Sequence, residues 1–308
     1  MKVITLVENT EGNAHCPTEH GLSYYIETGT HRILFDAGAD DLVVKNAEQL
    51  GVDLSAVDIA ILSHGHYDHG GGLPAFLNIN HTATVYVQKR AFGAYYSIHA
   101  EKNRYIGLPE ELRDHNQLVL LEGDYTIDSS LSLVTIHSDN EPRPSANRSL
   151  KEKIGESFIP DSFDHEQCLV IQENGCRYLF SGCAHHGILN ILNSFHELYH
   201  SEPNAVFSGF HMNQKEGFSD EDIQVIVDTA VKLSSTSTTF FTGHCTGTAP
   251  YEAMKKIMGD QLHYLHCGDS ITLDSKKKGT SYMKLHKLFA WGTVVCFVLT
   301  MITGYKRK

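Results

Sequence analysis

The chain alternates between short runs of apolar residues and longer segments whose apolar residues recur at helical spacing. Short alternating or continuous apolar runs predict β-strands, and repeats every three to four residues predict helices. The predicted strands are residues 2–8, 24–28, 31–36, 58–62, 84–87, 117–121, 125–128, 131–137, 168–171, 177–180, 205–209, 238–242, 261–265 and 270–273. The predicted helices are residues 42–50, 188–199, a helix capped by Ser219, and 249–258. Together these elements predict an α/β fold.

Two long segments interrupt this pattern. Residues 89–116 carry aromatic side chains among charged ones, and a connection of this length in a compact domain is usually functional or forms a lid. Residues 138–164 contain three prolines among polar residues. We interpret the first segment as a flap over a pocket and the second as a candidate substrate loop. The alternatives are a packed surface excursion for the first and a solvated insertion for the second.

The densest group of metal-binding residue types lies directly after the predicted strand 58–62. Within six residues the chain places His64, His66, Asp68 and His69, and the three glycines that follow predict a break in regular structure. His64 and His66 lie two positions apart, so both point the same way in an extended segment. Imidazole suits zinc, iron, copper and nickel, and a carboxylate can join it. One loop can therefore supply two neighbouring metal positions, as a two-metal hydrolytic site requires.

Further histidines follow other predicted strands. The hairpin formed by residues 168–171 and 177–180 leads into Cys183 and His185, the strand 205–209 leads into His211, and the strand 238–242 leads into His244. His20, near the N-terminus, is either a residue that supports the site or an ordinary loop histidine.

These motifs resemble a known family. The pattern HxHxDH, after an apolar strand and before GGG, resembles the signature of the metallo-beta-lactamase superfamily, and the resemblance extends over most of residues 1–274. The segments EHGLS and ILFDAG, the element GC-x-H-x-G around Cys183 and the segment HCTG at His244 resemble the branch named for the dihydropterin-ribofuranosyl-aminobenzene phosphate synthase of methanogens. The resemblance implies an αββα sandwich of two mixed β-sheets with outer helices.

The resemblance also implies a set of metal ligands. In the superfamily, residues matching His64 and His66 bind one ion, and residues matching Asp68 and His69 bind the other. His244 matches the last ligand. For the third histidine of the first ion, the spacing of many members favours His165, whereas the branch motif favours His185, which we prefer.

Two positions keep alternative roles. Most superfamily members place a metal-bridging aspartate where this chain has Cys183. A thiolate can bridge two ions, but we prefer a role as a small packing residue. His211 is expected to orient substrate or act as a general acid, and a structural role is the alternative.

The predicted function is that of a metal-dependent hydrolase or a related transferase. One ion would be held by His64, His66 and His185, and the other by Asp68, His69 and His244. Two ions lower the pKa of a shared water, and the resulting hydroxide, positioned by Asp68, would attack an ester, lactone or phosphoryl centre. Zinc is the first choice for both ions, with manganese or iron as alternatives.

The substrate is expected to be a small molecule. The branch resemblance implies that it is pterin-like or phosphorylated. Two other functions remain open: a di-iron redox protein of the same fold, and a membrane-tethered sensor that binds a ligand or metal without turnover.

The composition of the chain limits the classes of partner and the cellular compartment that we expect. The 308 residues carry a net charge of −12, which argues against a nucleic-acid partner because proteins that bind nucleic acid present basic faces. The seven cysteines form an odd number without a CxxC pair, which fits a reducing compartment. Residues 1–8 turn acidic too soon for a signal peptide.

The C-terminal segment differs from the rest of the chain. Residues 288–305 carry no charge, lie between basic residues, and have Trp291 and Tyr305 near their ends. Their length is near the lower limit for a membrane-spanning helix. We predict a catalytic domain at 1–274, a basic linker at 275–287 and a single-pass transmembrane helix at 288–305. The basic flanks favour a cell-membrane location with the catalytic domain on the cytoplasmic face.

Overall fold

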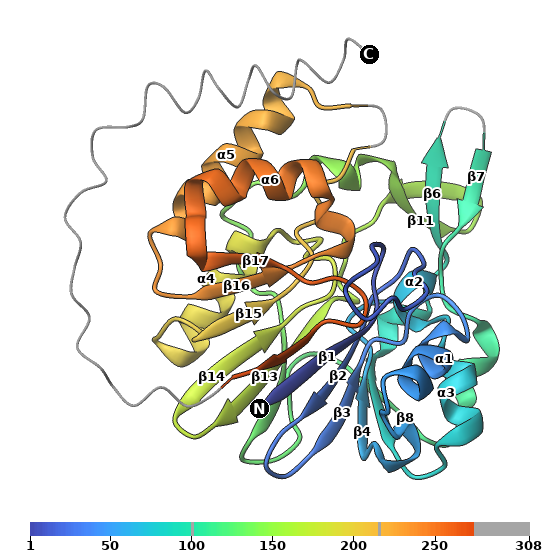
Figure 1. Ribbon diagram of the computed structural model, residues 1–308. Helices are drawn as coiled ribbons and strands as arrows, with labels where there is room; N and C mark the ends of the chain where they lie inside the picture. Colours follow the sequence, from blue (N-terminus) through green and yellow to red (C-terminus); the bar gives the residue numbers. More distant parts are fainter. Residues whose placement is uncertain (100–101, 215–216, 274–308) are drawn as a thin grey trace.

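The computed structural model describes residues 1–99, 102–214 and 217–273. In this part of the chain, two seven-stranded mixed β-sheets pack face to face, and helices cover the outer face of each sheet (Figure 1). The α/β fold with mixed sheets that the sequence predicts is therefore present. The helices are α1 (Leu42–Gln49), α2 (Tyr67–Gly70), α3 (Leu73–Ile79), α4 (Ile188–Tyr199), α5 (Asp220–Ser234) and α6 (Thr248–Met258).

The first sheet contains the N-terminal strands in the order β18-β1-β2-β3-β4-β5-β8. Strands β1 to β3 pair antiparallel, as the predicted hairpin requires, whereas β3, β4, β5 and β8 pair parallel. The strand bounds are β1 (Lys2–Val7), β2 (Ser23–Glu27), β3 (Arg32–Phe35), β4 (Ile59–Ile61), β5 (Thr84–Gln88), β8 (Leu118–Leu121) and β18 (Ser270–Thr272).

The second sheet has the order β17-β16-β15-β14-β13-β10-β9. Strands β14 to β17 pair parallel, and β13 pairs antiparallel with both β14 and β10. The strand bounds are β9 (Tyr125–Thr126), β10 (Leu131–Thr135), β13 (Gln167–Glu173), β14 (Cys176–Phe180), β15 (Ala205–Phe207), β16 (Thr239–Thr242) and β17 (Leu262–Tyr264).

Aromatic side chains fill the space between the two sheets. Phe180, Phe207 and Phe241, from three neighbouring strands, stack with ring centroids 4.5 and 4.6 Å apart. Tyr24 and Phe35 of the first sheet pack against this stack from the other side. Each of these rings removes a large apolar surface from water, so the inner layer contributes much of the stability of the sandwich.

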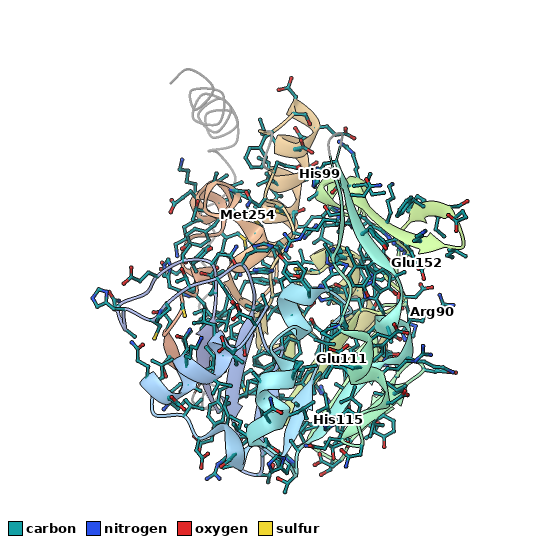
Figure 2. All side chains as sticks on the ribbon, turned by 90° about the vertical axis from the view of Figure 1, so that its right-hand side faces the viewer. Arg90, His99, Glu111, His115, Glu152 and Met254 are labelled. Carbon is teal, nitrogen blue, oxygen red and sulfur yellow. The ribbon has the colours of Figure 1, made fainter. Side chains whose placement is uncertain are left out.

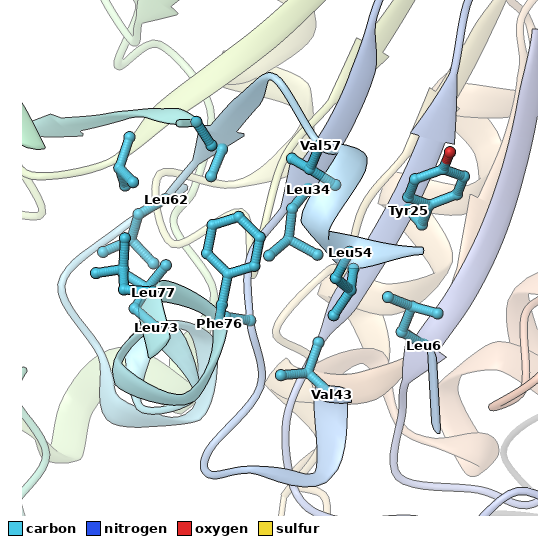
Figure 3. Packing of buried hydrophobic residues seen from close by; sticks show 14 of the residues in the cluster. Leu6, Tyr25, Leu34, Val43, Leu54, Val57, Leu62, Leu73, Phe76 and Leu77 are labelled. Atoms are coloured by element: carbon cyan, nitrogen blue, oxygen red, sulfur yellow. The ribbon is translucent and has the colours of Figure 1, made fainter. Parts of the chain in front are cut away.

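A separate apolar layer lies under the helices of each sheet. Figure 3 shows the layer on the first sheet, where Phe76 of α3 lies among Leu34, Leu73 and Leu77, and Val43 of α1 lies close by. On the second sheet, buried residues of α4, α5 and α6 form the matching layer. The strands therefore bury residues on both faces, which explains their nearly continuous apolar sequences.

The two long segments that interrupt the sequence pattern form a third sheet instead of irregular loops. Its order is β12-β11-β6-β7, so residues from 89–116 pair with residues from 138–164. Figure 2 labels His99 and Glu152 on this sheet. The strand bounds are β6 (Tyr95–His99), β7 (Lys102–Tyr105), β11 (Leu150–Ile154) and β12 (Ser157–Pro160).

The third sheet has its own small core, made of Tyr95, Ile106, Leu150 and Phe163. Tyr95 is buried, as the packed alternative for residues 89–116 expects. The same sheet also lines the cavity described below. The segment thus combines a packed base with a surface that faces the candidate site.

The prediction of a C-terminal membrane anchor is corrected. No helix within residues 1–99, 102–214 and 217–273 is long and apolar enough to cross a membrane. The longest helix of this part, α5, has 15 residues and carries charged side chains on its exposed side, whereas a span needs about 20 mostly apolar residues. The predicted anchor at 288–305 lies outside the described residues. A transmembrane helix and a cell-membrane location are therefore not supported.

Candidate metal centre

The candidate ligands lie on loops that leave the carboxyl ends of parallel strands. The histidine stretch follows β4 in the first sheet, and the loops that carry Cys183 and His185, His211, and His244 follow β14, β15 and β16 in the second sheet. Ligands of α/β proteins commonly bind at this edge, outside the carboxyl ends of parallel strands. The sandwich therefore brings residues more than a hundred positions apart to one place.

The prediction that the whole histidine stretch lies on a loop is wrong, although the chain does turn at Gly71 and Gly72 between two helices. The chain is extended only as far as His66, with φ −102° and ψ 145°. Helix α2 then begins, holding Asp68 and His69 buried, and α3 follows directly after Gly72. Asp68 therefore reaches the site from a helical turn, and not by continuing the alternation of His64 and His66.

The glycines after His69 serve close packing. A Cβ atom at Gly71 would collide with the carbonyl oxygen of Ala39, and one at Gly72 with that of Ala37. Both glycines have helical backbone angles that any residue can adopt, with φ −65° and −82°. The missing side chain therefore matters here because it lets α2 rest directly on the 37–39 loop.

His64, His66 and His185 come together on one side of the site. Nε2 of His64 lies 3.3 Å from Nε2 of His185. The ring of His66 packs edge-on against both, with centroid distances of 4.6 and 4.9 Å. All three are buried, and Nε2 of His66 has no hydrogen-bond partner among the described residues. Buried polar atoms are normally satisfied, and a shared cation would satisfy these.

Asp68, His69 and His244 come together on the other side. Oδ2 of Asp68 lies 4.0 Å from Nε2 of His69 and 3.4 Å from Nε2 of His244. The Nε2 atom of His244 is buried and also lacks a hydrogen-bond partner in the described part of the chain. His20 approaches the same carboxylate, with its Nε2 3.3 Å from Oδ2 of Asp68.

The thiol of Cys183 lies between these two groups. Its Sγ is 3.1 Å from Nε2 of His69. The ligand atoms of Cys183, His64 and His185 all lie within 4.8 Å of one another, and so do those of Cys183, His69 and His244. A packing role alone, which we preferred from the sequence, does not account for a buried thiol that faces both groups.

In four of the histidines, a hydrogen bond at Nδ1 orients the ring. The Nδ1 atoms of these four histidines lie 2.7–2.9 Å from oxygens of Ser63, Asp36, Asn147 and Asn9, which face His64, His69, His185 and His244, respectively. An oxygen that accepts from Nδ1–H leaves Nε2 with a free electron pair. Metal-binding histidines are commonly fixed in this way, so each ring presents Nε2 to the centre.

Three buried carboxylates hold the backbones of the ligand loops. They are Asp36, which accepts from the N–H of Ser63 at 2.7 Å; Glu8, which accepts from the N–H of His244 at 2.5 Å; and Glu166, which accepts from the N–H of His185 at 2.7 Å. Sequence analysis singled out none of these carboxylates. Glu8 and Asp36 are the last residues of predicted strands, and Glu166 lies two residues before one. These positions were the signal available in the sequence.

Burial and proximity set the protonation of the ligands. Burial and neighbouring histidines hold the pKa of His64 and of His185 well below the usual range. Both rings are therefore neutral near pH 7 and able to bind metal. Burial alone would lower the pKa of His244 and raise that of Asp68. The close approach of the two groups outweighs burial, raising the pKa of His244 to about 9 and holding that of Asp68 well below its usual range.

His165, the alternative third ligand, is engaged on both ring nitrogens. Its Nδ1 accepts a hydrogen bond from the N–H of Gly65 at 3.0 Å, and its Nε2 lies 3.2 Å from Oδ2 of Asp161. Its ring centroid is 6.0 Å from that of His64, compared with 4.8 Å for His185. The structure thus places His185, and not His165, in direct contact with His64.

Asp161 is a residue that sequence analysis missed. Its Oδ2 also lies 3.8 Å from Nε2 of His66. The ligand atoms of His66, Asp161 and His165 fall within 4.8 Å of one another, as do those of the groups around Cys183. His66 therefore belongs to two groups: the predicted one with His64 and His185, and a second one with Asp161 and His165. Asp161 lies in a proline-containing segment without strand periodicity, so no sequence signal pointed to it.

A cavity of about 770 Å³ opens onto the side of the centre that holds His211. Its lining includes His20, His211 and Cys245, together with Ser97 of the third sheet and Ser145, whose hydroxyl contacts Asp222 in the first turn of α5. Both ring nitrogens of His211 are buried without a hydrogen-bond partner among the described residues. The cavity is large enough for a small organic molecule.

Comparison with known families identifies the fold that holds this centre. Residues 17–208, more than half of the chain, match the family described as the metallo-beta-lactamase superfamily. This chain belongs to the metallo-beta-lactamase superfamily.

Two curated relatives come from Methanocaldococcus jannaschii. An uncharacterised protein is 31% identical over 274 residues, covering 86% of this chain and 98% of its own length. The second is named 7,8-dihydropterin-6-methyl-4-(beta-D-ribofuranosyl)-aminobenzene-5'-phosphate synthase. It is 25% identical over 297 residues, covering 88% of this chain and 96% of its own length. The predicted resemblance to the superfamily and to this branch is therefore confirmed.

Solved structures agree with this assignment. A crystal structure described as a metal-dependent hydrolase of the beta-lactamase superfamily matches with a TM-score of 0.74 and 27% identity, covering 89% of this chain and all of the other. A metallo hydrolase from Ignicoccus hospitalis matches with a TM-score of 0.51 and 11% identity, covering 90% of this chain and all of the other, and shows the fold alone.

Membership of the metallo-beta-lactamase superfamily gives the histidine groups a chemical context. Members bind divalent metal ions, and the described residues supply candidate His, Cys and Asp groups for them. The superfamily and its structural match support a metal-dependent hydrolase at the general level. The donor set is consistent with this, because Nε2 of His66 and Nε2 of His244 are buried without a hydrogen-bond partner among the described residues.

Proposed function

We propose that this protein is a hydrolase, or a related transferase, that uses two divalent metal ions at the convergence of the histidine loops. The observation that carries the proposal is the orientation of the rings. Four histidines have Nδ1 bound to a neighbouring oxygen and Nε2 directed toward the same small volume. Such an arrangement is costly in a buried site unless a cation occupies it.

The proposed ligands of the first ion are His64, His66 and His185. Support comes from the 3.3 Å approach of the Nε2 atoms of His64 and His185, and from the unpartnered Nε2 of His66 beside them. The proposed ligands of the second ion are Asp68, His69 and His244, supported by the approach of Asp68 to both rings. Cys183 is proposed as a bridging ligand because its thiol faces both groups.

Two divalent ions in such a site acidify water and stabilise the negative charge that develops on a substrate oxygen. The protein supplies the geometry. Asp36 and Asn147 hold two of the rings in place, and Asp68 presents a carboxylate oxygen that can position the attacking water. His211 faces the cavity with both ring nitrogens free and is proposed to contact the substrate. Zinc is the first choice for the metal, with manganese or iron as alternatives.

The proposed substrate is a small molecule with an ester, lactone or phosphoryl centre. The cavity beside His211 has the size for such a molecule. One relative is named as a synthase of a pterin-bearing phosphate ester. A phosphorylated or pterin-like compound is therefore the first class to test.

Metal-dependent turnover by the full chain tests the proposal. The protein is stripped with a chelator, reloaded with zinc, manganese or iron(II), and assayed against esters, lactones, phosphomonoesters and phosphodiesters. We expect at least one class to be hydrolysed only after reloading, and Asp68→Asn to lower that rate by about a hundredfold or more. Tight metal binding without turnover of any class would contradict a hydrolase and support a sensor.

A further inference from the structure

The cavity side of the metal centre carries a group of donors outside the two proposed histidine sets. Cys183, His211 and Cys245 have ligand atoms within 4.8 Å of one another. Cys183 and Cys245 are buried, and both ring nitrogens of His211 are buried as well. Of these three residues, only Cys183 is shared with the proposed centre.

Adjacent parallel strands hold these donors in a rigid frame. Cys183 follows β14, His211 follows β15, and Cys245 follows β16, in a short turn of residues His244–Thr246. Backbone hydrogen bonds join the three loops: Gly209 N–H donates to the carbonyl of Gly182 at 2.8 Å, and Asn213 N–H donates to that of Cys245 at 3.1 Å. The spacing of the donors is therefore fixed by the sheet.

Cys245 and His211 make few hydrogen bonds through their side chains, whereas Sγ of Cys183 also lies 3.1 Å from Nε2 of His69. Sγ of Cys245 accepts from the N–H of His211 at 3.3 Å and lies 3.5 Å from the carbonyl oxygen of Cys183. Both ring nitrogens of His211 lack partners among the described residues. The backbone of His211 is in the left-handed region, with φ 47°, which is unfavourable for a residue with a side chain. The surrounding structure thus holds His211 beside two thiols despite its strained backbone and its unsatisfied ring nitrogens.

We propose that Cys183, His211 and Cys245 form a metal site for a thiophilic ion, such as zinc or cadmium, on the cavity side of the centre. Two thiolates and an imidazole are ligands that such ions prefer. His211 and Cys245 also line the cavity, so a fourth position would face a molecule bound there. Each thiol releases its proton to solvent as the sulfur–metal bond forms, which balances the reaction.

The site goes beyond the proposed hydrolysis and rests on it only through Cys183. When an ion is bound, His211 cannot also donate a proton to substrate. An ion bound at this site would therefore change the rate at which the centre converts its substrate. Because the sulfur ligands give their own optical signal, binding here can be detected without any assay of activity.

The test is a cadmium titration of the chelator-stripped full chain, followed by the ultraviolet sulfur-to-cadmium charge-transfer band and by metal content. We expect a strong band in the parent. Cys245→Ser should reduce the band by about half, because one of two thiolate ligands is lost. His211→Ala should weaken cadmium affinity while keeping the band at saturation. Cys176→Ser, which removes a partly exposed thiol at the start of β14, should leave both unchanged.

Two results would overturn the inference. One is cadmium bound by the parent without a sulfur band. The other is a band that stays the same in Cys245→Ser, when circular dichroism shows that the variant is folded. If the histidine groups do not bind metal, the titration should instead show the sulfur band but no cadmium beyond the ion at this site. The titration therefore separates the two proposals.

Discussion

At the scale of single residues, neighbouring side chains fix one nitrogen in four of the rings of the candidate centre. Asn147 comes from the segment before β11, yet its Oδ1 lies 2.9 Å from Nδ1 of His185. Its side-chain amide also donates to the carbonyl oxygen of His185 at 2.7 Å. Asn147 therefore fixes both the ring and the backbone of a proposed ligand.

Replacing Asn147 with alanine should weaken metal binding. We expect Asn147→Ala to lower the affinity for zinc by about ten- to a hundredfold, as is typical for loss of a group that orients a metal-bound histidine. A competition titration with a chromophoric chelator measures this. The exposed Asn116→Ala is the matched control and should bind as the parent does. Equal affinities for Asn147→Ala and the control would contradict the proposed role.

His244 predicts how the metal-free protein responds to pH. Because its pKa is raised to about 9 in the folded state, the folded protein holds a proton that the unfolded chain releases near pH 6.5. This contribution to the free energy of unfolding, on the order of 3 kcal/mol, is complete below the unfolded pKa and is lost as the pH rises through the folded one.

Urea unfolding of the chelator-stripped protein tests this response between pH values of about 7 and 9.5. The free energy of unfolding should fall across this window. In His244→Gln the fall should be much smaller, because the titrating ring is gone. A parent and a variant with the same pH dependence would show that His244 does not carry the effect.

Sequence analysis singled out most residues of the candidate centre but not the residues that hydrogen-bond to them. His64, His66 and His69 stood out because they follow one strand within a few positions. Cys183 was identified as a candidate, but its position between two groups depends on the pairing of distant strands. Glu8 and Asn147 act through single hydrogen bonds across the fold, for which the sequence has no periodic signal.

At the scale of elements, the helices and strands of the sandwich followed their sequence patterns closely. Ser219 caps α5 with a full capping box, its side chain bonded to the N–H of Asp222. The third sheet was missed because β6 and β11 pair across more than fifty residues and prolines surround β11. The helix after His66 was missed because three glycines usually end regular structure.

The close packing of α2 gives a prediction about its glycines. Gly71→Ala should destabilise the protein by about 1–3 kcal/mol, because the new methyl group must displace the backbone of the 37–39 loop. Chemical denaturation measures the loss. Gly29→Ala is the control, since a Cβ there would meet only the Glu173 carboxylate at an ordinary 3.5 Å. A Gly71→Ala variant as stable as the control would contradict this account of the glycines.

At the scale of the whole molecule, two sheets of mixed strands place every candidate ligand at one edge. The sequence supports this architecture because its strands are apolar on both faces, as layers covered by helices require. The predicted transmembrane helix at 288–305 was inferred from an uncharged stretch with basic flanks and terminal aromatic residues, and it lies outside the described residues. No helix of residues 1–99, 102–214 and 217–273 is long and apolar enough to cross a membrane. The cavity could not be predicted, since the third sheet, the loop after β15 and the start of α5 all contribute to it.

The central claim is that His64, His66 and His185, and not His165, hold one of two metal ions. Metal content of the purified full chain, measured by mass spectrometry beside His185→Ala and His165→Ala, tests it most directly. We predict at least two ions per chain in the parent and in His165→Ala, and one fewer in His185→Ala. Loss of metal from His165→Ala alone, or a parent that binds no metal after reconstitution, would contradict the account.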